Sequence, residues 1–380
     1  MKAGWQHKTI DAVCEVVNGG TPKTGVSEYW DGPHQWITPA EMGKRATPYI
    51  DQTERTITDV GLQNSSARLL PAQSVILSSR APIGHLVINA VPMATNQGCK
   101  GLVPRDGLDC KYLYYYLASI VPLLNDLGTG ATFKELSGGK LKEVPIPVPP
   151  LPEQHRIVAI LDAAFDGIAT AKVNAEQNLQ NARALFESHL QKVFTERGEG
   201  WWETTLEKCC EQIFAGGDVP KDRCSQERTA KYSVPIYSNG AKDDGLYGFT
   251  DAARVTKPSI TISARGTIGF SAIRTEPFLP VVRLIVLTPD ENSVDLSFLH
   301  YAVQGMNFGN TGTSIPQLTV PNLTGRKLHL PSPAQQKVIV AKLDAVREET
   351  QRLEFLYRQK LAALEELKKS LLHQAFSGAL

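Results

Sequence analysis

The sequence predicts an α+β protein: two mixed α/β domains separated by two long helices that form an antiparallel coiled coil, with a pseudo-two-fold internal repeat. The first observation behind this prediction is a duplicated segment. It reads Pro-Pro-Leu-Pro-Glu-Gln-His-Arg-Ile-Val-Ala-Ile-Leu-Asp at 149–162 and Pro-Ser-Pro-Ala-Gln-Gln-Lys-Val-Ile-Val-Ala-Lys-Leu-Asp at 331–344. The constant shift that carries Gln154 onto Gln336 still holds a whole helix later. Two helices of equal length, with no insertion between their matched ends, are therefore expected.

The second observation is the apolar spacing within each copy, where steps of four and three residues alternate from Ile157 and from Ile339. This spacing is typical of a helix that packs against another helix. An uninterrupted run of roughly 43 residues spans about 65 Å at 1.5 Å per residue, so the helices are expected to be rods. The alternative is two unrelated amphipathic surface helices, which the constant register disfavours.

The positions expected at the helix–helix seam or at a contact with other subunits share this spacing or the duplicated register. They are Ile157, Leu161, Ile168, Asn178, Leu185, Ile339, Leu343, Val346, Leu353, Tyr357, Lys360 and Leu367. Asn178 and Lys360 interrupt the apolar stripe, which moves on to Leu179 and Leu361. We interpret them as a polar layer that fixes the register where the rods cross.

The third observation is that the segments before the two helices also resemble each other, though more loosely. Ser-Ser-Arg-Ala-Pro-Ile-Gly at 78–84 corresponds to Ser-Ala-Arg-Gly-Thr-Ile-Gly at 263–269. Short β-rich runs bounded by Pro or Gly predict strands, and 111–124 predicts a helix. The predicted order along the chain is a first domain (1–148), a helical spacer (149–197), a second domain (198–330) and a second helical spacer (331–380).

Composition places few limits on function. The chain has 380 residues and a formal net charge of +1, which neither favours nor excludes a nucleic-acid partner, because phosphate binding needs only a local patch. The first residues lack the apolar stretch of a signal peptide, and the most apolar run (112–124) is too short to span a bilayer. Six cysteines without a Cys-x-x-Cys pair predict free thiols in a reducing cytosol, so a cytoplasmic location is expected.

No catalytic motif is evident. Ser-Gly-Gly-Lys-Leu at 137–141 has the wrong spacing for a phosphate loop, and Gly-Thr-Gly-Ala-Thr-Phe at 128–133 fails the dinucleotide fingerprint at its last glycine. The Asn-Pro-Pro-Tyr or Asp-Pro-Pro-Tyr segment of adenine methylases is missing. The eight histidines form no His-x-x-x-His or His-Glu-x-x-His pattern. We therefore expect no catalytic residue, no metal site and no cofactor bound by this chain.

Two copies of a domain-plus-helix unit can pair their helices antiparallel and hold two recognition surfaces a fixed distance apart. Duplex DNA is a common partner with a matching periodicity. The sequence alone also allows a bivalent coiled-coil adaptor that binds proteins and has no DNA specificity. A third alternative is a self-contained modification enzyme, which should bind S-adenosylmethionine.

The chain resembles the DNA-specificity subunits of type I restriction-modification systems. The resemblance rests on the duplicated Gln-x-x-Ile-Val-Ala-x-Leu-Asp helix start, the Arg-x-x-Ile-Gly segment in each half and the Gly-Thr-Gly stretch at 128–130. It implies that each domain is a target-recognition domain for one half of a split, asymmetric DNA sequence. It implies further that the helices space the halves and dock two methyltransferase subunits, joined by restriction subunits that hydrolyse ATP and cut. S-adenosylmethionine, ATP and Mg would bind those partners, and each methyltransferase would flip out one adenine.

One departure from the family pattern lies at the second helix start, where Gln335 replaces the acidic residue found at Glu153. We expect the loss of this charge to weaken an interaction with the helix dipole.

Candidate DNA contacts are the least specific prediction, and they rest on side chains suited to base edges or phosphates in expected loops. They are Lys23, Lys44, Arg45, Arg80, Lys100, Thr132 and Lys134 in the first domain, and Lys221, Arg223, Arg228, Lys231, Asn239, Lys242 and Arg265 in the second. Thr129, Tyr237 and Ser238 are secondary candidates for phosphate. Because Arg80 and Arg265 recur in both domains, each equally suits a brace for a loop carboxylate.

Overall fold

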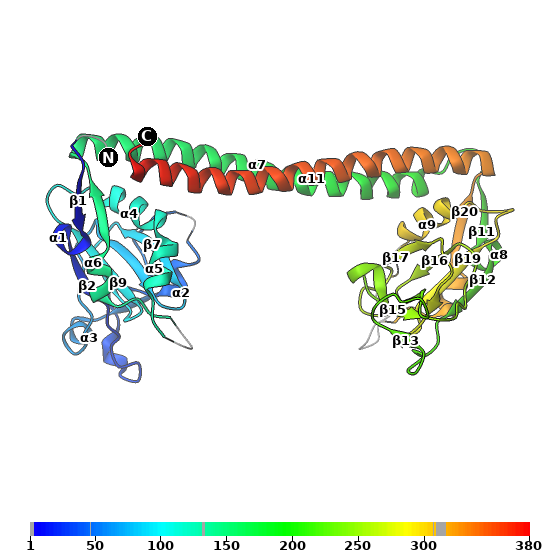
Figure 1. The fold of residues 1–380 in the computed structure, drawn as a ribbon, viewed down its shortest axis with the longest axis horizontal. Coiled ribbons are helices and arrows are strands. Elements are labelled where there is room, and N and C mark those ends of the chain that lie inside the picture. The colour runs from blue at the N-terminus through cyan, green and yellow to red at the C-terminus, as the bar shows by residue number, and fades with distance from the viewer. Residues whose placement is uncertain (1–3, 46, 131–133, 307, 309–316) are drawn as a thin grey trace. The chain divides into compact units, whose positions relative to one another are not determined.

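The computed structural model describes residues 4–45, 47–130, 134–306, 308 and 317–380. The chain divides into two compact units, residues 1–175 with 359–380 and residues 176–358. Each unit contains one mixed α/β domain and parts of both long helices, α7 (Leu151–Glu196) and α11 (Pro333–Ser377) (Figure 1).

The first unit is built on two sheets that share a core. A five-stranded sheet has the order β2 (Cys14–Asn18), β9 (Cys99–Pro104), β6 (Val75–Ser79), β7 (Ile83–Asn89) and β4 (Tyr49–Ile50). A three-stranded sheet has the order β5 (Arg55–Ile57), β3 (Trp30–Ile37) and β8 (Met93–Thr95). β1 (Gln6–Thr9) pairs with β10 (Pro145–Val148) directly before α7.

Short helices connect the strands of this unit. They are α1 (Ile10–Val13), α2 (Pro39–Met42), α3 (Asp59–Gln63), α4 (Cys110–Ser119), α5 (Val121–Leu127) and α6 (Gly138–Glu143), with a 3-10 turn η1 (Ser27–Tyr29). The helix expected over 111–124 is divided in two at Ile120, because Pro122 lacks the N–H that a continuous helix needs and begins the next one.

The second unit repeats this plan. One sheet has the order β12 (Cys210–Ala215), β19 (Ile285–Pro289), β16 (Ser259–Ile262) and β17 (Ser271–Arg274). The other has the order β13 (Cys224–Ser225), β15 (Leu246–Thr250), β14 (Val234–Tyr237) and β18 (Leu279–Pro280). β11 (Trp202–Thr205) pairs with β20 (Lys327–Leu330), and the short helices are α8 (Leu206–Cys209), η2 (Lys242–Gly245), α9 (Leu296–Gln304) and α10 (Val320–Thr324). The predicted internal repeat is confirmed by this shared topology.

A buried glutamine fixes the start of α7 to the first domain. Gln154 has no exposed surface, and its Oε1 accepts a hydrogen bond from the Asp109 backbone N–H at 2.8 Å. Its Nε2 donates to the carbonyls of Gly107 (2.9 Å) and Pro149 (2.8 Å). Asp109 in turn caps α4 by accepting from Tyr112 N–H. One side chain therefore ties the helix start, the loop before α4 and the strand exit together.

The second unit contains the same arrangement. Gln336 is fully buried, accepts from Asp295 N–H at 2.8 Å and donates to the carbonyls of Ser293 (3.2 Å) and Pro331 (3.0 Å). Asp295 caps α9 by accepting from the Phe298 N–H. The duplicated glutamine recognised in the sequence is thus a structural clamp in both halves.

The duplicated aspartate supplies a second anchor about two turns further along each helix. Tyr115 of α4 donates its hydroxyl to Asp162 Oδ1 at 2.5 Å, and Tyr301 of α9 donates to Asp344 Oδ1 at 2.5 Å. Lys111 adds an ion pair to Asp162 at 2.7 Å. Each domain is held on its long helix by the same two contacts.

Within each unit α7 and α11 run antiparallel. Lys172 pairs with Glu365 at 2.8 Å in the first unit, and Arg183 pairs with Glu354 at 3.1 Å in the second. The sequence repeat carries position 172 onto 354 and 183 onto 365, so the two ion pairs occupy equivalent places with their charges exchanged. This agrees with the predicted antiparallel pairing.

Most positions expected at the seam are buried or half-buried. Ile157, Leu161 and Leu343 are fully buried, and the remaining apolar members except two are half-buried: Ile168, Ile339, Val346, Leu353 and Tyr357. The stripe continues at Leu179 and Leu361, as predicted.

Four of the listed positions do not lie on the seam, and a contact of Leu185 and Leu367 with other subunits stays a prediction. Leu185 and Leu367 are 53% and 47% exposed, because they lie beside the buried stripe rather than on it. Asn178 and Lys360 are also exposed, so they form no buried polar layer. The apolar stripe passes them through Leu179 and Leu361 without a break.

The start of α11 compensates for its missing acidic residue. Ser332 Oγ accepts from the Gln335 N–H at 3.4 Å, while Gln335 Oε1 accepts from the Ser332 N–H at 3.2 Å. This reciprocal pair is a capping box, which satisfies helix-end N–H groups without a charge. In α7 the equivalent Glu153 instead pairs with Arg156 at 2.7 Å.

We expect Gln154→Leu to destabilise the protein by about 2 kcal/mol, because it removes three hydrogen bonds of a fully buried amide and leaves the buried Pro149 carbonyl without this partner, at roughly 1–3 kcal/mol for a buried unpaired group. Denaturant unfolding measures the change. Gln180→Leu, the same substitution at an exposed position of α7, is the control and is expected to stay within about 0.5 kcal/mol of the parent. Equal losses in the two variants would contradict the clamp.

Candidate nucleic-acid interface

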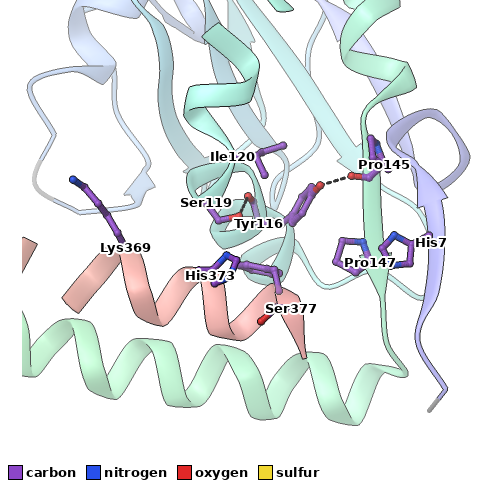
Figure 2. Close-up of a pocket in the computed structure, with 10 residues that line it drawn as sticks. His7, Tyr116, Ser119, Ile120, Pro145, Pro147, Lys369, His373 and Ser377 are labelled. Atoms are coloured by element: carbon purple, nitrogen blue, oxygen red, sulfur yellow. Dashed lines mark hydrogen bonds between the residues drawn. The ribbon is translucent and has the colours of Figure 1, made fainter. Parts of the chain in front are cut away.

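The first unit contains a cleft lined by several polar side chains. It has a volume of about 300 Å³ and lies between α4, β10 and the end of α11, with His7, Tyr116, Lys369 and His373 among its lining residues (Figure 2). The Tyr116 hydroxyl donates to the Pro145 carbonyl, and burial raises its pKa to about 12. The hydrogen bonds among these described lining residues run from the Tyr116 and Ser119 hydroxyls to backbone carbonyls, and none joins a nucleophile to a base.

Three of the cysteine thiols are buried, and the described residues show no metal-binding cluster. Burial raises the pKa values of the Cys14, Cys99 and Cys110 thiols to about 12, which keeps them protonated and unreactive near neutral pH. No group of three or more His, Cys, Asp or Glu side chains with metal-binding geometry occurs among these residues. Nor is any of their helices long and apolar enough to cross a bilayer.

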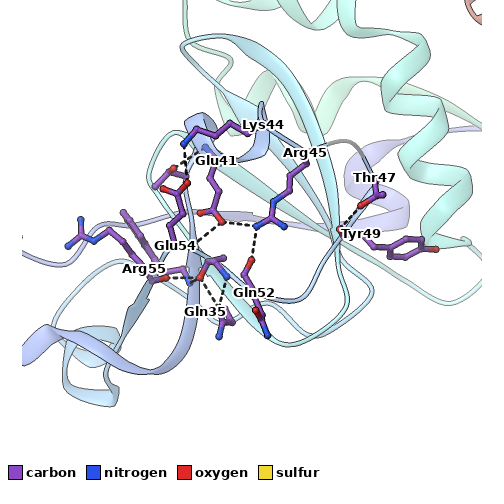
Figure 3. Close-up of polar contacts among 12 residues, drawn as sticks. Gln35, Glu41, Lys44, Arg45, Thr47, Tyr49, Gln52, Glu54 and Arg55 are labelled. Carbon is purple, nitrogen blue, oxygen red and sulfur yellow. Dashed lines mark hydrogen bonds and ion pairs between the residues drawn. The ribbon is translucent and has the colours of Figure 1, made fainter. Parts of the chain in front are cut away.

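The binding candidates therefore lie on the domain surfaces. In the first domain Lys44 and Arg45 belong to a network around α2 (Figure 3). Arg45 pairs with the buried carboxylate of Glu41 at 2.9 Å and donates to the Gln52 carbonyl, while Lys44 pairs with Glu54 at 3.0 Å. The Arg45 guanidinium therefore braces a loop by neutralising a carboxylate that is only 4% exposed.

Lys100 is a correction to the prediction. It lies in β9, is only 6% exposed, and desolvation lowers the pKa of its ammonium group. The sequence signal failed because Lys100 lies in a central strand, paired on both sides by β2 and β6, rather than in a loop. A DNA phosphate cannot approach a side chain that is covered in this way.

The remaining candidates of the first domain are more accessible. Lys23 is exposed on the loop after β2, and Lys134 is exposed with its Nζ 3.5 Å from the Asn125 carbonyl oxygen. Thr132 lies outside the described residues. Thr129 exchanges backbone hydrogen bonds with Glu135.

In the second domain two candidate arginines already have carboxylate partners. Arg223 pairs with Asp251 at 2.8 Å, and Arg228 lies 3.6 Å from Glu276. Asn239 joins two loops, because its Nδ2 donates to the Val282 carbonyl at 2.6 Å and its Oδ1 accepts from Ala264 N–H at 2.7 Å. These contacts fix the surface rather than leave polar groups free for a ligand.

The exposed lysines of the second domain are less engaged. Lys221 follows β12 in a loop and Lys242 begins η2, and both are exposed. Lys231 Nζ lies 5.0 Å from the Tyr232 ring centroid. Tyr237 and Ser238 are half-buried, with the Tyr237 ring packed on Phe278.

Arg80 and Arg265 occupy equivalent places and meet equivalent partners. Arg80 lies 3.7 Å from Glu135, and Arg265 donates to Gln317 at 3.0 Å. The 182-residue shift that relates the helices also carries position 135 onto 317. The following residues confirm the match: Leu136 N–H donates to the Ser79 carbonyl, and Leu318 N–H to the Ala264 carbonyl. The geometry favours the bracing role for both arginines.

A second duplicated loop appears only when the structures of the two domains are compared. Asn-Gly-Gly-Thr-Pro-Lys at 18–23 follows β2, and Ala-Gly-Gly-Asp-Val-Pro-Lys at 215–221 follows β12. Gly19 N–H donates to the Cys99 carbonyl at 3.2 Å, and Gly216 N–H to the Leu284 carbonyl at 2.8 Å. A side chain at Gly19 would collide with the Asn96 carbonyl, so the loop needs glycine there.

Sequence reasoning missed Arg55 and Arg254, which lie near these two loops. Arg55 is exposed at the start of β5, with its guanidinium carbon 3.5 Å from the Trp30 ring centroid. Arg254 is exposed with its guanidinium carbon 4.3 Å from the Phe214 ring centroid. The only available signal was the pairing of an arginine with aromatic residues far away in the sequence.

Comparison with known proteins gives a consistent result. The family described as "Type I restriction modification DNA specificity domain" matches residues 2–181 and 199–365. The specificity subunit of type I restriction enzyme MjaIX from Methanocaldococcus jannaschii is 39% identical over 186 residues, which cover 48% of this chain and 43% of that subunit. The match thus spans less than half the length of this relative.

Two solved structures share the fold over the full chain. One is a chain from a structure of complex assembly and conformational transition of the type I R-M system, with TM-score 0.85, 18% identity and coverage of 100% of this chain and 99% of that one. The other is the HsdS subunit from Thermoanaerobacter tengcongensis, with TM-score 0.68, 19% identity and coverage of 100% and 98%.

The bracing role of Arg80 can be tested by a double-mutant cycle with Glu135. Both side chains are more than one third exposed, so we expect a coupling energy of only about 0.2–1 kcal/mol between Arg80→Ala and Glu135→Ala in unfolding experiments. Glu135→Gln is the control and should keep the interaction, because Arg265 already uses Gln317 in this way. Strictly additive losses, with a DNA-binding salt slope lowered by about one in Arg80→Ala alone, would instead identify a phosphate contact.

Proposed function

Because the chain belongs to the type I restriction modification DNA specificity family, we propose that each of its two domains recognises one half of a bipartite, asymmetric DNA target. The single observation that carries this proposal is the contrast between what is duplicated and what is not. The clamps at Gln154 and Gln336 and the anchors at Asp162 and Asp344 are repeated almost atom for atom. The surface loops and their charged residues differ.

This contrast is expected for two domains that recognise different DNA sequences but are attached to their long helices by equivalent contacts. A domain that recognises its own half-site must vary the side chains that face base edges, while the contacts that hold it on the helix stay constant. Two identical surfaces would instead favour a symmetric target. An asymmetric target with two dissimilar halves follows.

The two long helices serve as the spacer between the half-sites in this proposal. Their nearly equal lengths, 46 and 45 residues, and the absence of proline beyond their first turns support a stiff element. The domains would enter the DNA major groove about one helical turn apart.

In this proposal the chemical steps take place on other subunits. The relatives named above are specificity subunits. We propose that S-adenosylmethionine, ATP and Mg bind to methyltransferase and restriction partners rather than to this chain. The proposed setting is the cytoplasm, where the DNA and those partners are found. Each methyltransferase would flip out one adenine beside its half-site.

The exposed apolar residues of the helices fit two equivalent partner-docking surfaces. Val173 and Leu367 are 64% and 47% exposed in the first unit, and Phe355 and Leu185 are 59% and 53% exposed in the second. The sequence repeat carries Val173 onto Phe355 and Leu185 onto Leu367. Exposed apolar groups that recur at duplicated positions favour two copies of one partner, here the methyltransferase subunit.

The competing function is a bivalent protein adaptor built on the same coiled coil. Duplex DNA binding that weakens steeply with salt, and that strengthens when the methyltransferase subunits are present, separates the two functions. An adaptor would show neither property.

Exchange of residues 1–148 for the corresponding domain of another family member tests the modular target. We expect the methylome of a strain that carries the chimera to change in one half of the target only, since each domain has its own clamp and core. The reciprocal exchange of residues 198–330 is the matched control and should change the other half. A chimera that altered both halves together would refute the modular arrangement.

The proposed docking surface on the long helices predicts a change in the number of bound methyltransferase subunits. Leu185→Asp with Phe355→Asp should lower the number of methyltransferase subunits bound from two to one, because a charge replaces an apolar contact. Size-exclusion chromatography with mass determination measures the stoichiometry. Lys192→Asp, another exposed position of α7, is the control. Retention of two subunits by the double variant would rule out this surface.

A further inference from the structure

Two arginines differ from every other stacked arginine in the described part of the chain. Six arginines there lie over aromatic rings: Arg55, Arg228, Arg254, Arg274, Arg326 and Arg347. Four also use their guanidinium groups elsewhere. Arg228 lies near Glu276, Arg274 donates to Thr261, Arg326 to the Asn322 carbonyl and Arg347 to Gln304. Arg55 and Arg254 remain exposed, and within the described residues neither has a side-chain hydrogen bond or a carboxylate oxygen within 4.0 Å.

The support beneath Arg55 is rigid. Trp30 and Trp36 are 7% and 2% exposed and meet edge to face, with ring centroids 5.1 Å apart. Arg55 is the register partner of Trp36 across β3 and β5, and a bulge after Trp30 brings that ring directly under the guanidinium. The side chain extends away from the Glu41–Arg45 network (Figure 3). Its N–H donors are thus oriented by packing and not by a protein acceptor.

The two stacks are adjacent to the same duplicated loop. In the first domain Trp36 Nε1 donates to the Gly20 carbonyl at 2.9 Å, and Trp30 Nε1 to the Lys23 carbonyl at 3.3 Å. In the second domain Phe214 lies two residues before Gly216, and a Cβ at Gly217 would lie 4.0 Å from Arg254 Nη1. Each Gly-Gly loop also ends in an exposed lysine, Lys23 or Lys221.

We propose that Arg55 and Arg254 are the guanine-reading residues of the two half-sites, one in each domain, with Lys23 and Lys221 contacting the adjacent phosphates. This inference rests on the proposed function and specifies which base each arginine recognises. A planar guanidinium with two free parallel N–H donors matches O6 and N7 of guanine in the major groove, which is the commonest base-specific contact. Stacking on an aromatic ring limits the rotamers that binding must fix, and so favours discrimination.

The stacks arise from different strands in the two domains. Arg55 opens β5, whereas Arg254 follows β15, and their aromatic supports come from β3 and β12. Arginines from non-equivalent positions therefore lie beside equivalent loops. This is the arrangement expected when two domains place guanine at different steps of their half-sites.

The test uses the assembled complex of this chain with its methyltransferase subunits, S-adenosylmethionine and a library of duplexes randomised around the target. Arg55→Lys keeps the charge and loses the planar fork, so we expect preference at one G·C pair of one half-site to fall by about 10- to 100-fold. Arg254→Lys should do the same in the other half-site only. Arg55→Gln should move that preference toward A·T, because glutamine matches the adenine edge.

Each arginine variant is the control for the other, and Arg105→Lys, an exposed arginine at the opposite end of β9 from Lys100, should change neither half. The inference would be overturned by an unchanged base preference or by a loss of preference in both half-sites at once. It would also be overturned by an equal loss of methylation on all duplexes together with a lower Tm, because that result indicates a stack that only stabilises the sheet. If the unsubstituted complex shows no bipartite target at all, the proposed function fails instead.

Discussion

The fold depends on one buried polar contact that occurs once in each half, the glutamine at the first turn of each long helix. Gln154 and Gln336 are fully buried, and each bonds to three backbone groups, two from the loop before the domain's helix and one from the proline just before the long helix. An amide is suited to this place, because it donates and accepts at once and carries no charge to desolvate. The tyrosine–aspartate bond further along each helix then fixes the rotation of the domain about the helix axis.

Because of this attachment, the residues that stabilise each domain differ from the residues proposed to select its DNA target. The clamp, the anchor and the core of each domain involve buried residues, whereas the proposed DNA contacts lie on exposed loops and at a strand end. Substitution of exposed side chains usually changes stability little. A domain can therefore acquire a new sequence preference while its attachment to the helix persists. The bracing pairs Arg80–Glu135 and Arg265–Gln317 belong to the constant part, although they contain arginine.

Sequence analysis predicted the repeat, the helices and most of their seam, because periodicity and constant register are properties of the chain itself. It failed where position depends on tertiary context. Leu185 and Leu367 share the duplicated register but lie beside the buried stripe, and Lys100 lies in a central strand that its neighbours did not reveal. Arg55 was missed because its significance arises from Trp30, which is far from it along the chain and close only after β3 and β5 pair.

The near-neutral charge of the chain has a physical consequence for recognition. Several cations expected to bind DNA are matched by carboxylates: Lys44 by Glu54, Arg45 by Glu41, Arg223 by Asp251 and Arg228 by Glu276. Each matched cation attracts phosphate weakly, so the chain alone should have low affinity for DNA of arbitrary sequence. Low non-specific affinity raises the ratio between target and bulk DNA, which is the quantity that matters when non-target sites are in vast excess. A few unmatched, oriented arginines then contribute more to discrimination than a broad basic surface would.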